Sequence, residues 1–522
     1  MTKKWTVALV LLLLCGLAYS ELQNVQIGGE LRVRYRYYRN TFTDQNPGLG
    51  GFRREIRIPN FFLVKRPIGP RGVSSIFDWN GRGADWHLSE TATLLNVKAD
   101  FTNNVSAFVE LYDFNQWGED FRSNWITGAD NRARTADDVE FNQAYIETNE
   151  MFGMPLRLRI GRQALKFGKG WLISDMLTPT QRLSFDAIRL TYDVDAFSVD
   201  AFAAKLLENG VTEEDGDADF YGIYGTYEAF KPLQVSAYWL WLRDARSLND
   251  TNFPWFVEWL EDIFGVDDYD VTNLHTVGVR LFGNAAGFDY DLETAYQFGN
   301  ADFYGPGFRP FGLRYGVTDA DFDNWAAELT VGYTFDTTWS PRVCAFGNYF
   351  QGHDNRDISF WDWLNPFYKP DASVSFNRLF SDINHLPVVN DNGWLSNFAQ
   401  AGLGVELQPT EAVRLHFHVA KDWIVAPFDY PVSFKLGRFR VPIAPALSFW
   451  TEEGSDDIGW EVAFWAKYNY SPDLYFLLYY NHLFTGEGLA RGAFIQFNGT
   501  DFSGGSDDED ADYVFLMSVL KF

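Results

Sequence analysis

Apolar and polar residues alternate along many stretches of this chain, and this period of two constrains its fold more than any other feature. From Val25 to Tyr37 the odd positions are mostly apolar, whereas the even positions carry Gln, Gly, Glu and three Arg residues. Successive side chains of a β-strand point to opposite faces, so this stretch predicts a strand with one apolar face and one polar, cationic face. The same alternation recurs at 105–111, 156–160, 188–192, 277–281, 329–335, 413–419 and 460–468.

The connections between these stretches are short and long in turn. Short polar turns are predicted at 102–104, 193–195, 231–232, 284–286, 409–411 and 471–472. Long segments lie between them, at 39–84, 118–138, 208–218, 244–272, 300–322, 353–395, 425–457 and 485–509. Tight turns on one rim and long loops on the other are typical of a transmembrane β-barrel. We therefore expect an all-β outer-membrane barrel of about 18 antiparallel strands, with short periplasmic turns and long extracellular loops.

The composition agrees with a barrel and excludes other classes. The 522 residues include 48 Phe, 26 Tyr and 19 Trp, yet the mean hydropathy is −0.22. No internal apolar run reaches the ~18 residues of a spanning helix, which excludes a polytopic helical membrane protein. A closed barrel pairs every backbone group in lipid, and its aromatic belts account for the aromatic content. The net charge of −27 argues against nucleic acid as a partner, and two cysteines exclude a disulfide scaffold and a Cys-ligated zinc site.

We expect targeting signals at both ends of the chain. Lys3 and Lys4, the apolar run 5–14 and the small residues around Ser20 predict a secretory signal peptide over 1–20, cleaved near Ser20. A membrane anchor is the alternative, although the run is short for one. We expect a single barrel domain over 21–522. The last strand ends on Phe522, which is similar to the signal that the barrel assembly machinery binds.

A set of basic residues is expected to line the lumen if the apolar faces point to lipid. The set consists of Arg32, Arg34, Arg36, Arg157, Arg159, Arg189, Arg280, Arg414 and Lys467, with Arg162 and Lys166 where their strand meets its loop. Guanidinium groups bind carboxylates bidentately, so such a lumen suits a polyanion. In the alternative interpretation, the arginines pair with acids on neighbouring strands and only stiffen the barrel wall. The inward acids available for this are Asp289, Asp291, Glu293, Glu328, Glu406 and Glu461.

The long loops and the remaining polar residues leave several functions open. Loops 39–84 and 353–395 are long enough for one of them to fold inward as a gate or plug. The acidic runs 213–219 and 507–510 are either divalent-cation sites at a lipopolysaccharide surface or solvated loops. His416 and His418 are expected to be a lumenal polar pair rather than metal ligands. With no GxSxG or HExxH motif, we expect neither an enzyme nor a metal or other cofactor.

Three motifs resemble the bacterial alginate export family. The stretch Leu158–Gly168 is similar to the family's LRxGRQxLxYG element, 184–190 is similar to the segment that follows it, and 479–487 is similar to its last hairpin. Lys169 and Gly170 depart from the acidic position after the first element, and Thr485 replaces a proline. The family's type member is an outer-membrane barrel channel that secretes a polyuronate, and its strand number agrees with the count expected here.

The resemblance implies passive export of an anionic polysaccharide, an alginate-like polyuronate, through an arginine-lined lumen. A substrate-selective porin that takes up small anionic solutes is the alternative. A lumenless adhesive barrel and an outer-membrane hydrolase are further alternatives. We expect a monomer in the cell outer membrane, in contact with lipid, lipopolysaccharide and periplasmic export components, and without nucleic acid.

Overall fold

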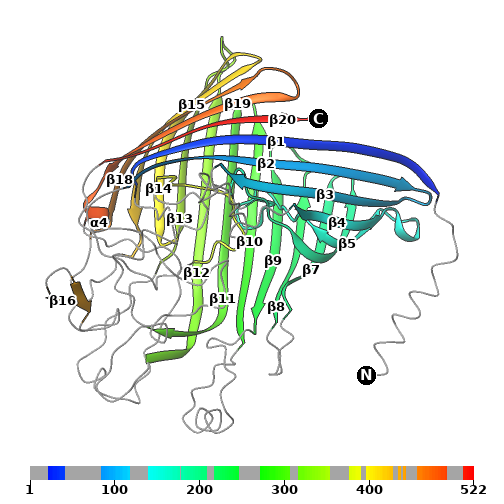
Figure 1. Cartoon of the computed structure of the whole chain (residues 1–522), viewed down its shortest axis with the longest axis horizontal. Helices are drawn as coiled ribbons and strands as arrows, with labels where there is room; N and C mark the ends of the chain where they lie inside the picture. The colour runs from blue at the N-terminus through cyan, green and yellow to red at the C-terminus, as the bar shows by residue number, and fades with distance from the viewer. Residues whose placement is uncertain are drawn as a thin grey trace, which may run out of the picture.

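Eighteen strands form one antiparallel sheet that closes on itself. The computed structural model describes residues 21–41, 84–117, 139–176, 178–208, 217–245, 271–305, 315–352, 376–388, 396–426, 433–436, 439–442, 455–490 and 510–522. Strand β1 (Leu22–Thr41) pairs with β2 (Ala84–Phe101) on one side and with β20 (Ala511–Lys521) on the other. Figure 1 shows this seam, where the first and last strands of the chain lie side by side. The predicted barrel and its strand number are confirmed.

The remaining strands follow one another around the wall in chain order. They are β3 (Val105–Gln116), β4 (Glu140–Thr148), β5 (Leu156–Gln163), β6 (Phe185–Val194), β7 (Phe197–Leu207), β8 (Ala218–Tyr227), β9 (Gln234–Asp244), β10 (Thr272–Ala285), β11 (Phe288–Gly305), β12 (Tyr315–Thr334), β13 (Arg342–Phe350), β14 (Phe398–Thr410), β15 (Val413–Ile424), β18 (Asp457–Asn469) and β19 (Leu474–Thr485). A separate hairpin, β16 (Ser433–Leu436) and β17 (Phe439–Pro442), belongs to the β15–β18 connection.

Two short helices complete the described elements, the 3-10 turn η4 (Met151–Gly153) and α4 (Glu487–Ala490). Among the described residues, no helix is long and apolar enough to cross a membrane.

Short and long connections alternate as predicted, with one addition. The six predicted turns lie between β2 and β3, β6 and β7, β8 and β9, β10 and β11, β14 and β15, and β18 and β19. The β5–β6 connection, over residues 164–184, is a long one that the sequence pattern did not predict. Residues 1–20 lie outside the described residues, so the signal peptide and its cleavage near Ser20 stay predictions.

The outer face of the barrel is apolar. On β10 the side chains of Val277 and Val279 are exposed, and on β12 those of Leu329 and Val331 are exposed, whereas the alternate positions such as Arg280 face inward and are partly buried. Exposed large apolar side chains of this kind recur on strands around the sheet. An apolar band of this size needs a lipid environment, and a closed sheet leaves no unpaired edge within it.

A row of charges marks the loop-bearing end of this outer face. Arg162, Asp186, Lys205, Asp219 and Arg243 occupy matched positions on the five adjacent strands β5 to β9 and alternate in sign. Two positions nearer the turns lies an aromatic row, in which ring centroids are 5.0 to 5.5 Å apart between Tyr221 and Trp241, Trp241 and His275, and His275 and Phe298. Aromatic side chains beneath charges are typical of the membrane–water interface, so these rows place the edge of the lipid.

The seam between the ends of the chain is closed by a glycine. The Gly29 N–H donates to the Phe522 carbonyl at 2.8 Å, and the Phe522 N–H donates back at 3.1 Å. The Phe522 ring lies over Gly29, where a Cβ atom would be 2.5 Å from its Cζ and 2.7 Å from the Leu94 carbonyl oxygen. Only glycine lets the terminal ring approach β1 this closely.

Candidate functional site: a plugged lumen

The β5–β6 connection crosses the inside of the barrel. At one end of its course the Pro179 carbonyl accepts a hydrogen bond from Arg32 Nη1 at 2.6 Å, and the Thr180 hydroxyl accepts one from Arg34 Nη2 at 3.1 Å, both from β1. At the other end Lys169 Nζ lies 2.8 Å from Glu328 Oε1 on β12, across the barrel from β1. The segment therefore spans the lumen from wall to wall.

A second segment, from the β13–β14 connection, lies against the first. The Ser174 N–H donates to the Phe380 carbonyl at 3.0 Å, and the Phe380 N–H donates to the Leu172 carbonyl at 2.8 Å. Gln297 on β11 fixes this segment to the wall through a reciprocal pair of hydrogen bonds with the Asn377 backbone, at 2.7 and 2.8 Å. We call residues 164–176, 178–184 and 376–388 the plug. Part of loop 353–395 thus folds inward; most of loop 39–84 lies outside the described residues.

The plug has a hydrophobic core of its own that merges with the wall. Trp171, Phe376 and Phe350 are each at most 1% exposed, with ring centroids 6.0 to 6.3 Å apart. The Phe380 ring lies 5.0 Å from the rings of both Phe185 and Phe220. Buried aromatic clusters contribute strongly to stability, so the plug is packed in place.

Titratable groups of the plug are shifted by burial and by each other. Burial opposes ionisation of Asp175, but Lys166 at 3.1 Å and Arg182 at 3.5 Å outweigh it, and the pKa of Asp175 lies below its usual value. Burial raises the pKa of Asp382. For His385, burial together with neighbouring positive charge holds the pKa well below its usual value, so its ring is neutral at pH 7.

The arginine stripe on β1 is bound by carboxylates. Arg34 is fully buried and its Nε lies 2.8 Å from Glu90 Oε2 on β2, and Arg36 Nη2 donates to the other oxygen of Glu90. Arg32 pairs with Glu30 on its own strand, and the plug residue Arg182 reaches the same carboxylate at 2.8 Å. The like charges of the stripe are therefore offset within the wall and by the plug.

Three further inward arginines pair with acids on the adjacent strand. Arg159 lies 2.6 Å from Glu147, Arg189 lies 2.8 Å from Asp200, and Arg280 lies 2.5 Å from Asp291. The cross-strand ion pairs considered above are thus present for these residues.

Arg157 and Arg414 lie nearer the turn-bearing rim. Arg157 follows the inward alternation of β5 and is half-buried, while Arg414 is exposed and is the register partner of Lys467 on β18.

Arg162 lies on the outer face rather than in the lumen, which corrects its expected placement. Its Nη1 is 3.4 Å from Asp186, whose side chain is 62% exposed. The alternation of β5 explains this, because Ile160 is outward and two residues further on Arg162 is outward again. Gln163 takes the inward position and donates to the Ala187 carbonyl at 2.8 Å.

The inward acids Glu406 on β14 and Glu461 on β18 form a second group of contacts. Glu406 binds Arg342 at 2.7 Å, and Glu461 lies 3.1 Å from His418, which in turn is 3.0 Å from His416. The two histidines are thus an inward polar pair. Within the described residues no group of three His, Cys, Asp or Glu is placed to hold a metal ion.

The acidic runs of the loops are described only in part. Asp217 and Asp219 bind Lys205 at 2.8 and 2.7 Å, whereas 213–216 and 507–509 lie outside the described residues.

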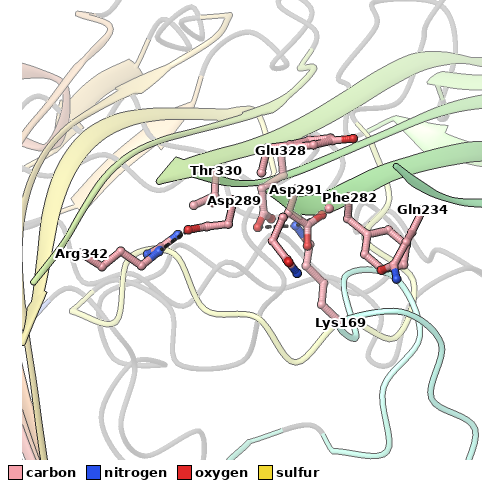
Figure 2. A pocket seen from close by; sticks show the side chains of 11 residues that line it. Lys169, Gln234, Phe282, Asp289, Asp291, Glu328, Thr330 and Arg342 are labelled. Carbon is pink, nitrogen blue, oxygen red and sulfur yellow. Dashed lines mark hydrogen bonds and ion pairs between the residues drawn. The ribbon is translucent and has the colours of Figure 1, made fainter. Parts of the chain in front are cut away.

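A cavity of about 350 Å³ lies between the plug and the wall strands β9 to β13. Lys169 enters it from the plug, and Gln234, Phe282, Asp291, Thr330 and Arg342 line it from the wall. Figure 2 shows Arg342 directed toward Asp289 and Lys169 extending from the plug below the strands. Sequence reasoning missed Lys169 and Arg342 as lumen residues. Arg342 could have been found from the sequence, because it lies an even number of residues from the other inward residues of β13. Lys169 lies outside the strands, so no side-chain alternation marks it.

A closed barrel with an apolar outer surface and loop segments inside its lumen is the architecture of an outer-membrane β-barrel protein. A family model described as alginate export matches residues 79–494. The chain belongs to the alginate export family and is an outer-membrane channel; its family and fold are those of a transport protein rather than an enzyme. No curated protein matches the sequence.

Solved structures from Pseudomonas aeruginosa are similar over nearly the whole chain. OccK8 (OprE) has a TM-score of 0.49 and 12% identity, and 96% of this chain and 98% of that chain are covered. OpdL has a TM-score of 0.48 and 10% identity over 96% and 99%. OccK10 (OpdN) has a TM-score of 0.46 and 10% identity over 95% and 99%. At this level of similarity none of them informs the substrate.

Proposed function

We propose that this channel passively exports an anionic polysaccharide of the polyuronate type. The observation that carries the proposal is the group of inward arginines that are held by carboxylates at ion-pair distance, as in Arg159–Glu147 at 2.6 Å and Arg189–Asp200 at 2.8 Å. Membership of the alginate export family supports the same substrate class.

Paired arginines suit a moving polyanion better than free ones. A carboxylate of the polymer can replace the wall carboxylate that is bound to a guanidinium, and the bonds broken and formed are similar in strength. The polymer is therefore bound at each arginine, but not so tightly that it cannot move on. Interspersed acids then favour release to the next pair. Because the plug spans the lumen, export of a chain also requires the plug to shift, and its contacts to β1 and β12 are the bonds that must break.

A porin for small anionic solutes is the second candidate. The plug favours it, because a lumen spanned from wall to wall by a packed segment admits small solutes more readily than a polymer chain.

The proposal extends to the surroundings of the barrel. We propose that the protein is a monomer that lies among lipopolysaccharide. The barrel assembly machinery would insert it through Phe522 after cleavage near Ser20, and periplasmic export components would supply its substrate.

Single-channel recording of the refolded protein in a planar bilayer tests the proposal. The reversal potential in a salt gradient gives ion selectivity, and oligomannuronate is then added. Anion selectivity with block by the oligomer, weakened in Arg159→Ala and Arg189→Ala, supports export of a polyanion. Arg162→Ala is the matched control, because its side chain lies on the outer face. Cation selectivity, or a conductance indifferent to uronates, overturns the proposal.

A further inference from the structure

The cavity beside the plug has two rows of wall residues at successive heights. Gln234 on β9, Phe282 on β10, Asp291 on β11 and Thr330 on β12 are register partners in turn, so they form one inward row across four strands. Asn284 lies two positions nearer the turn on β10. Figure 2 shows this wall with Lys169 beneath it. A ligand here touches wall and plug together.

The charged side chains around this cavity are already bound in ion pairs. Both oxygens of Asp289 accept from Arg342, at 2.6 and 2.9 Å, and both oxygens of Asp291 accept from Arg280, at 2.5 and 2.9 Å. Lys169 is bound to Glu328. Three carboxylates and two cations line the cavity, and the Arg280 guanidinium bound to Asp291 balances the third carboxylate. The cavity therefore carries no net positive charge that would attract an additional anion.

The neutral polar side chains of the same wall have donors and acceptors that are available for hydrogen bonds. Within the described part of the chain, the side chains of Gln234, Asn284 and Thr330 make no hydrogen bond. Each carries donors, acceptors or both. The Phe282 ring lies in the first row beside Gln234, with the Arg280 guanidinium 4.3 Å from its centroid on one side. An aromatic ring bordered by amides and a hydroxyl provides an apolar surface with hydrogen-bonding edges.

We propose that this cavity binds one pyranose residue of the transported saccharide through its hydroxyl groups and not through its charge. The sugar ring lies against Phe282, and its hydroxyls bond to Gln234, Asn284 and Thr330. Lys169 at the margin places the bound sugar in contact with the plug. The inference rests on the proposed function in taking a saccharide as the cargo, and it adds that recognition at this point is of the neutral ring.

A matched pair of trisaccharides tests this inference. Mannotriose and the mannuronate trisaccharide differ in the oxidation state of the C6 carbons, so their rings offer similar hydroxyls and differ in charge. Each is added to the turn-bearing side in single-channel recordings. We expect mannotriose to block at least as tightly as the uronate. The triple variant Gln234→Ala, Asn284→Ala, Thr330→Val is expected to weaken block by mannotriose about tenfold or more.

Two controls keep the result interpretable. Gln26→Ala removes an exposed inward glutamine at the same rim on β1, outside the cavity, and is expected to leave block unchanged. Asn284→Ala alone, at an exposed position, is expected to weaken block about threefold even if the triple variant does not fold.

The outcomes separate the two proposals. Block by the uronate alone, or block by mannotriose that survives the Asn284 and triple changes, overturns this inference and leaves polyanion export standing. Block by mannotriose that the variants weaken, without block by the uronate, supports this inference and overturns polyanion export. If neither trisaccharide blocks, the inference is overturned as well.

Discussion

Lys169 and Glu328 form an ion pair with 2.8 Å between Nζ and Oε1, although 159 residues separate them in the chain. Lys169 belongs to the plug and Glu328 to β12, so this pair fixes one end of the plug to the wall. The hydrogen bonds of Arg32 and Arg34 to Pro179 and Thr180 fix the other end. We therefore expect conductance through the barrel to depend on contacts at two opposite walls.

Removing the charge of Lys169 is expected to loosen the plug. In Lys169→Met the Glu328 carboxylate, 9% exposed, loses its closest cation. We expect the plug contact to weaken by about 1–2 kcal/mol and the mean single-channel conductance to rise. Lys205→Met, which removes an ion-paired lysine from the outer face, is the matched control. A conductance equal to that of the unchanged protein would contradict a role for this pair in closure.

The conductance is expected to rise as the pH falls from 7.5 to 5.5. The pKa of His385 in the plug lies well below its usual value because of burial and the charges of Arg378 and Lys169. A depressed pKa contributes stability that is complete above the usual histidine value of about 6.5 and is lost as the pH falls toward the lower one. Single-channel recordings across this range measure the effect. His385→Gln is expected to flatten the response, and His87→Gln, at an exposed position on β2, is not.

Asp382 acts in the opposite sense. Burial raises its pKa, so its contribution to plug stability is present at low pH and is lost as the pH rises through the raised value. Asp382→Asn removes this contribution and leaves His385 as the main titrating group of the plug. Its response to acidification is then expected to be steeper than that of the unchanged protein.

The strands and most inward arginines could be predicted because side-chain alternation is a local property. The partners of those arginines could not, because Glu90 lies 56 residues from Arg34 and reaches it only through the register of β1 and β2. Arg162 was expected in the lumen at the point where its strand meets its loop, although counting from Ile160 by twos places it on the outer face.

The first plug segment escaped prediction for a different reason. Trp171, Leu172 and Ile173 are buried on all sides, at 1 to 3% exposure, so no polar face reveals their position. A short apolar run of this kind cannot be distinguished from a strand by periodicity alone. Its contacts to β1 and β12 also depend on closure of the whole barrel.

Closure at the seam is expected to depend on Gly29. A side chain there would collide with the Phe522 ring and with the Leu94 carbonyl, and backbone cannot move away cheaply. We expect Gly29→Val to reduce the fraction of protein that migrates as folded barrel in heat-modifiability gels. Gly225→Ala is the control, because its nearest contact would be an ordinary 3.7 Å from Val199. Equal folding of the two variants would contradict the account of the seam.

Replacing Glu90 is expected to weaken both the wall and the plug. Glu90 accepts hydrogen bonds from Arg34 at 2.8 Å, from Arg36, and from the plug residue Thr180 at 3.2 Å. In Glu90→Gln the fully buried Arg34 guanidinium loses its counter-charge, a change that costs about 3–5 kcal/mol for buried pairs. We expect a lower unfolding midpoint in urea and a higher single-channel conductance. Glu147→Gln breaks the Arg159 pair away from these plug contacts, so it is expected to lower stability without raising conductance. If both variants raise conductance equally, Glu90 does not act through the plug.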